Sequence, residues 1–164
     1  FVGMHGSIGW SHHGEGEPIA EWNVRADPPA CRAAFAAGWD KTVTPLDTCA
    51  RVRLTGDKYR AVADSDDPLA RDVIENYRVW KEFGGGREWT DGSSILFDTV
   101  AVYLCYSDAL LEMKRQPVRV DDAGFTRVEP GAPQVNCAMS WKDLSAFEDL
   151  LVERLTALDL KRER

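Results

Sequence analysis

The feature that most constrains the fold is a strong helix signal followed almost at once by a strand signal. Asp27 is a favourable N-cap residue, Pro28 suits the first helical position, and Gly38 suits the residue just past the helix end. Residues 41–46 then have the composition of a short strand. A helix that leads so directly into a strand is typical of α/β proteins. We therefore expect an open, mostly parallel sheet flanked by helices.

Hydrophobic periodicity and turn signals predict the remaining elements. They are a strand end over 1–8, helices over 51–64, 67–83 and 98–111, strands over 118–121, 125–129 and 134–139, and a terminal amphipathic helix. The first two of these later strands flank Asp122-Ala123-Gly124 and predict a C-terminal β-hairpin. Ser140 and Asp143 predict a capping box before the terminal helix. The 164 residues are enough for one core, so we expect a single domain over 1–164.

Charge and hydropathy exclude several classes of partner. The net charge of −7 disfavours nucleic acid and anionic membranes, which call for a basic face, and is compatible with binding a cation. No apolar run approaches the roughly 20 residues of a membrane span, and no secretory signal is visible. Because the first residue is Phe1 and not Met, we expect the true N-terminus to lie upstream. The compartment and a homo-oligomeric state are left open.

The four cysteines do not form a metal or redox motif, because no two of them have C-x-x-C spacing. Cys31 and Cys105 lie in apolar helical patterns and Cys137 in a strand pattern, which favours buried free thiols. Disulfides remain an alternative for an exported protein. His5, His12 and His13 lack a partner at zinc-like spacing and do not predict a transition-metal site.

Glu21 and Asn23 are the first candidate site residues. In an extended segment, residues two apart point to the same side. An ionised carboxylate accepts hydrogen bonds and a carboxamide both donates and accepts, so the pair suits the neighbouring hydroxyls of a sugar. The alternative is a solvated polar loop.

Asp98 and Asp47 are two further candidate carboxylates. Asp98 begins a predicted helix after a polar loop, where a carboxylate is favourable for the helix dipole, so an ordinary helix-start Asp is the alternative to a functional role. Asp47 follows a strand end, where α/β proteins often place functional groups, but we interpret it as structural.

Four motifs occur in a defined order along the chain. They are Glu21-Trp-Asn-Val-x-x-Asp-Pro, Thr44-Pro-Leu-Asp-Thr, Ser94-Ile-Leu-Phe-Asp-Thr-Val-Ala-Val-Tyr-Leu and Val118-Arg-Val-Asp-x-x-Gly. This order and spacing resemble the C-terminal half of the inosine–uridine-preferring nucleoside hydrolases, from about Gly3 to about Leu158.

The resemblance implies calcium-dependent hydrolysis of the N-glycosidic bond of ribonucleosides. It implies that Glu21 and Asn23 bind ribose hydroxyls and that Asp98 is a calcium ligand. The family supplies the general base and most calcium ligands from an N-terminal Asp cluster that this sequence does not contain. We therefore expect this chain to be the C-terminal portion of such an enzyme, with no catalytic base of its own, and to be inactive in isolation.

Two positions depart from the family pattern. Many members have His immediately before the Asp at position 98, and that His is thought to protonate the leaving base, whereas this chain has Phe97. The family often has Asn where this chain has Glu15. These differences favour the alternatives of a non-catalytic riboside-binding relative or a truncated copy.

Overall fold

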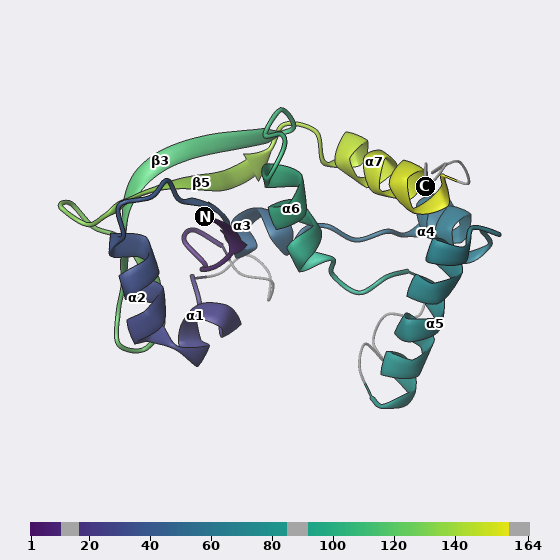
Figure 1. The fold of residues 1–164 in the computed structure, drawn as a ribbon, viewed down its shortest axis with the longest axis horizontal. Helices are drawn as coiled ribbons and strands as arrows, with labels where there is room; N and C mark the ends of the chain where they lie inside the picture. Colours follow the sequence, from purple (N-terminus) through teal and green to yellow (C-terminus); the bar gives the residue numbers. More distant parts are fainter. Residues whose placement is uncertain (11–16, 85–91, 158–164) are drawn as a thin grey trace, which may run out of the picture. The chain divides into compact units, whose positions relative to one another are not determined.

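The computed structural model describes residues 1–10, 17–84 and 92–157 (Figure 1). The chain divides into two compact units. The first unit comprises Phe1–Val52 and Ile95–Asp143, and the second comprises Arg53–Ser94 and Leu144–Arg164. The single domain expected from the sequence stays a prediction. Both units are discontinuous in sequence, because the chain leaves the first unit after Val52 and returns to it at Ile95.

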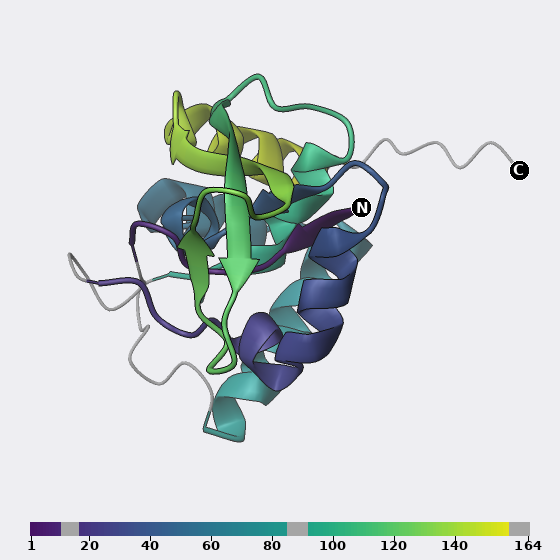
Figure 2. The same cartoon turned by 90° about the vertical axis from the view of Figure 1, so that its left-hand side faces the viewer.

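The first unit is built on an open five-stranded sheet with the order β1-β2-β5-β3-β4 (Figure 2). Its strands are β1 (Val2–Met4), β2 (Thr42–Thr44), β3 (Leu111–Val120), β4 (Thr126–Val128) and β5 (Gln134–Trp141). The pairs β1–β2 and β2–β5 are parallel, whereas β5–β3 and β3–β4 are antiparallel. The predicted open sheet with flanking helices is confirmed, and the sheet is mixed. The predicted hairpin is β3–β4, which turns at Gly124 with a φ of 85°.

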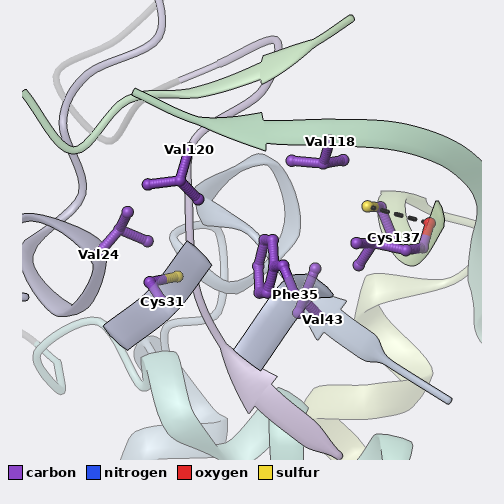
Figure 3. Packing of buried hydrophobic residues seen from close by; sticks show 8 residues of the cluster. Val24, Cys31, Phe35, Val43, Val118, Val120 and Cys137 are labelled. Atoms are coloured by element: carbon purple, nitrogen blue, oxygen red, sulfur yellow. Dashed lines mark hydrogen bonds between the residues drawn. The ribbon is translucent and has the colours of Figure 1, made fainter. Parts of the chain in front are cut away.

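Helices α1 (Trp22–Ala26) and α2 (Pro28–Ala36) supply side chains to a core on one face of this sheet. Asp27 caps α2 as expected, because its Oδ1 accepts the Ala30 N–H at 2.9 Å. Figure 3 shows the buried side chains pointing toward one another from these helices and from the strands. The cluster contains Val24, Cys31, Phe35, Val43, Val118, Val120, Val135 and Cys137. Burial of this apolar surface stabilises the helix–sheet packing.

The opposite face of the sheet meets the short helix α3 (Leu46–Cys49). Side chains alternate along a strand, so Thr44 points away from the face on which Val43 packs. Its hydroxyl is 2.8 Å from the Thr48 hydroxyl of α3, which also donates to the Ala138 carbonyl of β5 at 3.0 Å. Helix α6 (Phe97–Leu104) contacts α3, β1 and β2. Helices therefore flank the sheet on both faces.

The second unit is helical. It contains α4 (Gly56–Ala63), α5 (Pro68–Glu82) and α7 (Leu144–Thr156), which contact one another. Lys58 of α4 joins α7 through ion pairs of 3.1 Å with Glu148 and 2.8 Å with Asp149. In the part of the chain that the structure describes, no helix is both long and apolar enough to cross a membrane.

Several predicted boundaries were wrong for tertiary reasons. The helix expected over 98–111 ends at Leu104, because Leu111 already pairs with Trp141 in the sheet. Ser140 does not cap the terminal helix, since it lies within β5 and α7 begins only at Leu144. The short helices α1 and α3 were not predicted.

The cysteines follow the prediction with one exception. All four are free thiols, and Cys31, Cys49 and Cys137 are buried. Cys105 is exposed, because α6 ends at Leu104 and leaves Cys105 at the C-cap. Burial raises the pKa of the Cys31 and Cys137 thiols to about 11, which keeps both thiols protonated near neutrality.

Candidate functional site

The three residues singled out in the sequence line one pocket of the first unit. The pocket has a volume of about 270 Å³, near the lower end for small-molecule sites, which begin at roughly 300 Å³. Its lining residues are Met4, Ile19, Glu21, Trp22, Asn23, Leu46, Phe97 and Asp98. Met4 is the last residue of β1, so the pocket lies where open α/β sheets commonly bind ligands, beyond the carboxyl end of a strand.

Glu21 is held in place by backbone amides. Its carboxylate is the N-cap of α1 and accepts from Asn23 N at 2.8 Å and from Val24 N at 3.2 Å. It also accepts from Gly6 N at 3.1 Å, and the residue is only 3% exposed. A carboxylate has about four acceptor positions, so three backbone bonds leave one for a ligand hydroxyl in the pocket.

Asn23 does not lie in the extended segment that its sequence predicts. It lies in the first turn of α1, and its Nδ2 donates to the Met4 carbonyl at 3.0 Å. The side chain therefore fastens the start of α1 to the end of β1. Its other amide atom, Oδ1, is an acceptor, so the residue can still bind a donor at the pocket. Glu21 and Asn23 are close because both lie at the start of α1, and not because side chains alternate along an extended segment.

Asp98 is exposed at the pocket, in the first turn of α6. The helix start is anchored by the Leu96 N–H, which donates to the Val52 carbonyl at 3.0 Å. A carboxylate at this position is favourable for the helix dipole. Because the side chain is accessible, its oxygens can meet a cation or a hydroxyl. Phe97 lines the same pocket and offers no exchangeable proton there.

The turn that follows β1 forms a second, buried part of the site. Ser7 N donates to Thr126 Oγ1 at 3.0 Å, and Thr126 Oγ1 donates back to the Ser7 carbonyl at 2.9 Å. Asp47 accepts from Ile8 N at 2.9 Å and from Gly9 N at 2.7 Å. Sequence reasoning missed Ser7 and Thr126, because their pairing joins residues far apart along the chain.

Four pocket residues were also not predicted, namely Met4, Ile19, Trp22 and Leu46. Met4 and Leu46 flank strand ends, which is a signal that a search for strand termini could have used. Trp22 is 71% exposed beside Glu21, and the Arg25 guanidinium lies 5.1 Å from its ring centroid. The pocket therefore has apolar walls that can pack against a ring, and polar side chains that can bind hydroxyls.

His5 directly follows Met4, which lines the pocket. Burial lowers its pKa below the ordinary 6.5, and the negative charges of Glu21 and Asp98 oppose that shift only in part. Its Nδ1 is buried and has no hydrogen-bond partner among the described residues. The neutral imidazole is therefore the favoured form at neutral pH.

The described residues do not by themselves form a metal site. Calcium takes about six to eight oxygen ligands, and no group of three or more His, Cys, Asp or Glu side chains in the described ranges could hold an ion. His12, His13 and Glu15 lie outside the described residues.

Fold and pocket together define the class: an α/β protein of the nucleoside hydrolase-like fold, with carboxylates and a carboxamide at the end of its first strand. The sequence model of the inosine-uridine preferring nucleoside hydrolases matches residues 1–148. The chain belongs to this family.

Solved structures with a similar fold include two nucleoside hydrolases. A plant nucleoside hydrolase, the PpNRh1 enzyme, has a TM-score of 0.78 and 23% identity over 93% of this chain and 52% of that chain. A purine-preferring ribonucleoside hydrolase from Gardnerella vaginalis has a TM-score of 0.72 and 18% identity over 94% of this chain and 51% of that chain. This chain therefore spans about half the length of each. A search of curated protein sequences finds no match.

Proposed function

We propose that this chain is the substrate-binding half of a hydrolase that cleaves the N-glycosidic bond of ribonucleosides. The observation that carries the proposal is the convergence of Glu21, Asn23 and Asp98 on one pocket of the size of a small ligand. The sugar would bind between the free acceptor position of Glu21 and the Oδ1 of Asn23. Both are positioned by backbone bonds before a ligand arrives, which lowers the entropic cost of binding.

Cleavage of this bond passes through a transition state with oxocarbenium character at the sugar. A rigid pair of hydroxyl-binding groups accelerates such a step when it fits the flattened ring better than the ground-state sugar. The apolar walls, including Trp22 and Phe97, would receive the base. Trp22 and Phe97 supply packing surface at the leaving group and no general acid.

We propose calcium as the cofactor, with Asp98 as one of its ligands. This part of the proposal rests on the family resemblance and on the accessible carboxylate of Asp98. The described residues supply too few ligands, so the remaining oxygens and the general base would come from elsewhere in the protein. For the same reason the isolated 164 residues should be inactive.

The test uses the protein translated from the whole reading frame and measures base release from inosine, uridine and other ribonucleosides, with calcium and with a chelator. Asp98→Asn should lower calcium-dependent turnover, and Asn23→Ala should weaken riboside binding. Asp108→Asn, just beyond the other end of α6, is the matched control and should change neither. Turnover that is unchanged by the chelator would contradict the calcium proposal. Turnover by the isolated chain would contradict the expectation that this chain alone is inactive.

A second function is favoured by Phe97 and Glu15, the two departures from the family pattern. Phe97 lines the pocket at the position where many family members carry a proton donor. In that case the protein binds ribosides without cleaving them. Calorimetric titration of the full protein with inosine distinguishes the two, since saturable binding without base release supports the binding protein.

A further inference from the structure

The turn Gly6–Gly9 is held by buried polar side chains from separate parts of the first unit. Asp47 is 5% exposed, Ser7 is fully buried and Thr126 is 3% exposed. A buried carboxylate is costly unless it is hydrogen-bonded. The Asp47 carboxylate is satisfied by the Ile8 and Gly9 amides, so its burial depends on this turn.

The same turn carries three walls of the pocket. The Gly6 carbonyl accepts the Leu46 N–H at 2.8 Å, and the Gly6 N–H donates to Glu21. The Ile19 N–H donates to Ser7 Oγ at 3.1 Å. Ile19, Glu21 and Leu46 all line the pocket. A displacement of the turn would therefore move both the sugar-binding carboxylate and the apolar wall beside it.

Asp47 holds the far end of the turn without lining the pocket itself. Its Oδ1 would lie 3.1 Å from a Cβ atom added to Gly9, which shows how closely the carboxylate and the turn approach. One helical turn later, the Arg51 guanidinium lies 4.4 Å from the ring centroid of Trp10. Arg51 Nε also donates to the Asp47 carbonyl at 3.1 Å. Both side chains therefore fix the segment Ile8–Trp10.

We propose that Asp47 is a positioning residue for the riboside pocket, which it shapes by holding Ile8 and Gly9 and, through the turn, Ile19, Glu21 and Leu46. The proposal rests on the proposed function in naming a riboside as the ligand. It goes beyond that function by assigning a role to a carboxylate that does not line the pocket.

Asp47→Asn is the informative change, because the carboxamide keeps the shape and one acceptor oxygen but loses the second acceptor and the charge. Thr48→Val is the matched control. Thr48 is the next residue of α3, is fully buried, and hydrogen-bonds to Thr44 and Ala138 but not to the turn. Both variants lose buried hydrogen bonds, and only the first loosens the turn.

The experiment measures inosine affinity by calorimetry and amide hydrogen exchange by NMR on the full protein, at a temperature where each variant is folded. Asp47→Asn should weaken inosine binding about tenfold or more and speed exchange of the Ile8 and Gly9 amides relative to the core amide of Val43. Thr48→Val should leave inosine affinity within about twofold of wild type. This should hold even if its midpoint of unfolding falls as far as that of Asp47→Asn.

Gly9→Ala tests the same contact from the other side if Asp47→Asn does not fold, and should weaken binding in the same direction. Unchanged inosine affinity in Asp47→Asn or Gly9→Ala, or an equal loss in Thr48→Val, would overturn the positioning role. A wild-type protein that binds no riboside would instead overturn the proposed function and the ligand named here. Amide exchange at Ile8 and Gly9 distinguishes failure of the positioning role from failure of the proposed function. It reports whether Asp47 restrains the turn, and it needs no ligand.

Discussion

The Gly6 amide donates to the Glu21 carboxylate across 3.1 Å, and this bond joins the turn after β1 to the first residue before α1. Glu21 thus has two roles at one site. It accepts from two backbone amides at the start of α1 and from the Gly6 amide in the turn, and it presents a carboxylate to the pocket. Substitutions of Glu21 should therefore change stability as well as ligand binding.

Glu21→Gln should lower the free energy of unfolding by about 1–3 kcal/mol, because a carboxamide cannot accept all three amide bonds and leaves a buried donor unpaired. Urea denaturation measures the loss. Glu112→Gln, at an exposed position of β3, is the control and should stay within about 0.5 kcal/mol of wild type. Equal stabilities of the two variants would show that the cap contributes nothing.

When the native protein is treated with a disulfide reagent near pH 8, one cysteine thiol should react fast and the other three should react slowly. The thiolate is the reactive form, and burial raises the pKa of Cys31 and Cys137 to about 11 and that of Cys49 further still. Cys105 is exposed and should react first. Cys105→Ser should remove the fast phase, and full reaction should require denaturant. A fast phase that survives in Cys105→Ser would contradict the burial of the other three thiols.

His5 should make the protein less stable in mild acid. Its pKa is lowered by burial in the folded state, so between the folded value and the ordinary 6.5 the unfolded chain binds more protons. The stability that the neutral imidazole contributes is therefore present above about pH 6.5 and is lost as the pH falls through the folded pKa. His5→Gln should flatten the decline in unfolding free energy between about pH 7 and pH 5. Parallel pH profiles for the variant and the wild type would refute this role.

Phe97→His should accelerate cleavage of ribosides with poor leaving groups, because it places a proton donor at a wall of the pocket. General acid catalysis contributes about 10²–10⁴-fold where geometry is favourable, so a tenfold or greater rise in kcat/KM for inosine is expected in the active full protein. A nitrophenyl riboside, whose leaving group departs without a proton, should gain little. Phe97→Leu is the control for a change of shape alone. Equal gains on both substrates would point to altered packing rather than proton donation.

Local signals in the sequence determined the α/β class, the start of α2 at Pro28, the hairpin around Gly124 and the identity of the candidate site residues. These features depend on neighbours within a few positions, such as a capping carboxylate or a glycine with positive φ. The family resemblance adds the order of the motifs, and it predicts that Glu21, Asn23 and Asp98 belong to one site.

Only the tertiary structure decided how those residues meet. Asn23 was expected in an extended segment and lies in a helix of five residues, which is too short to show a hydrophobic period. Ser140 was expected to cap a helix and lies in β5, because pairing with β3 continues to Trp141. The pairing of Ser7 with Thr126 and the hold of Asp47 on Ile8 and Gly9 also required the fold. Hydrogen bonds between distant segments leave no periodic trace in a sequence, because they depend on where the packed sheet brings each backbone amide.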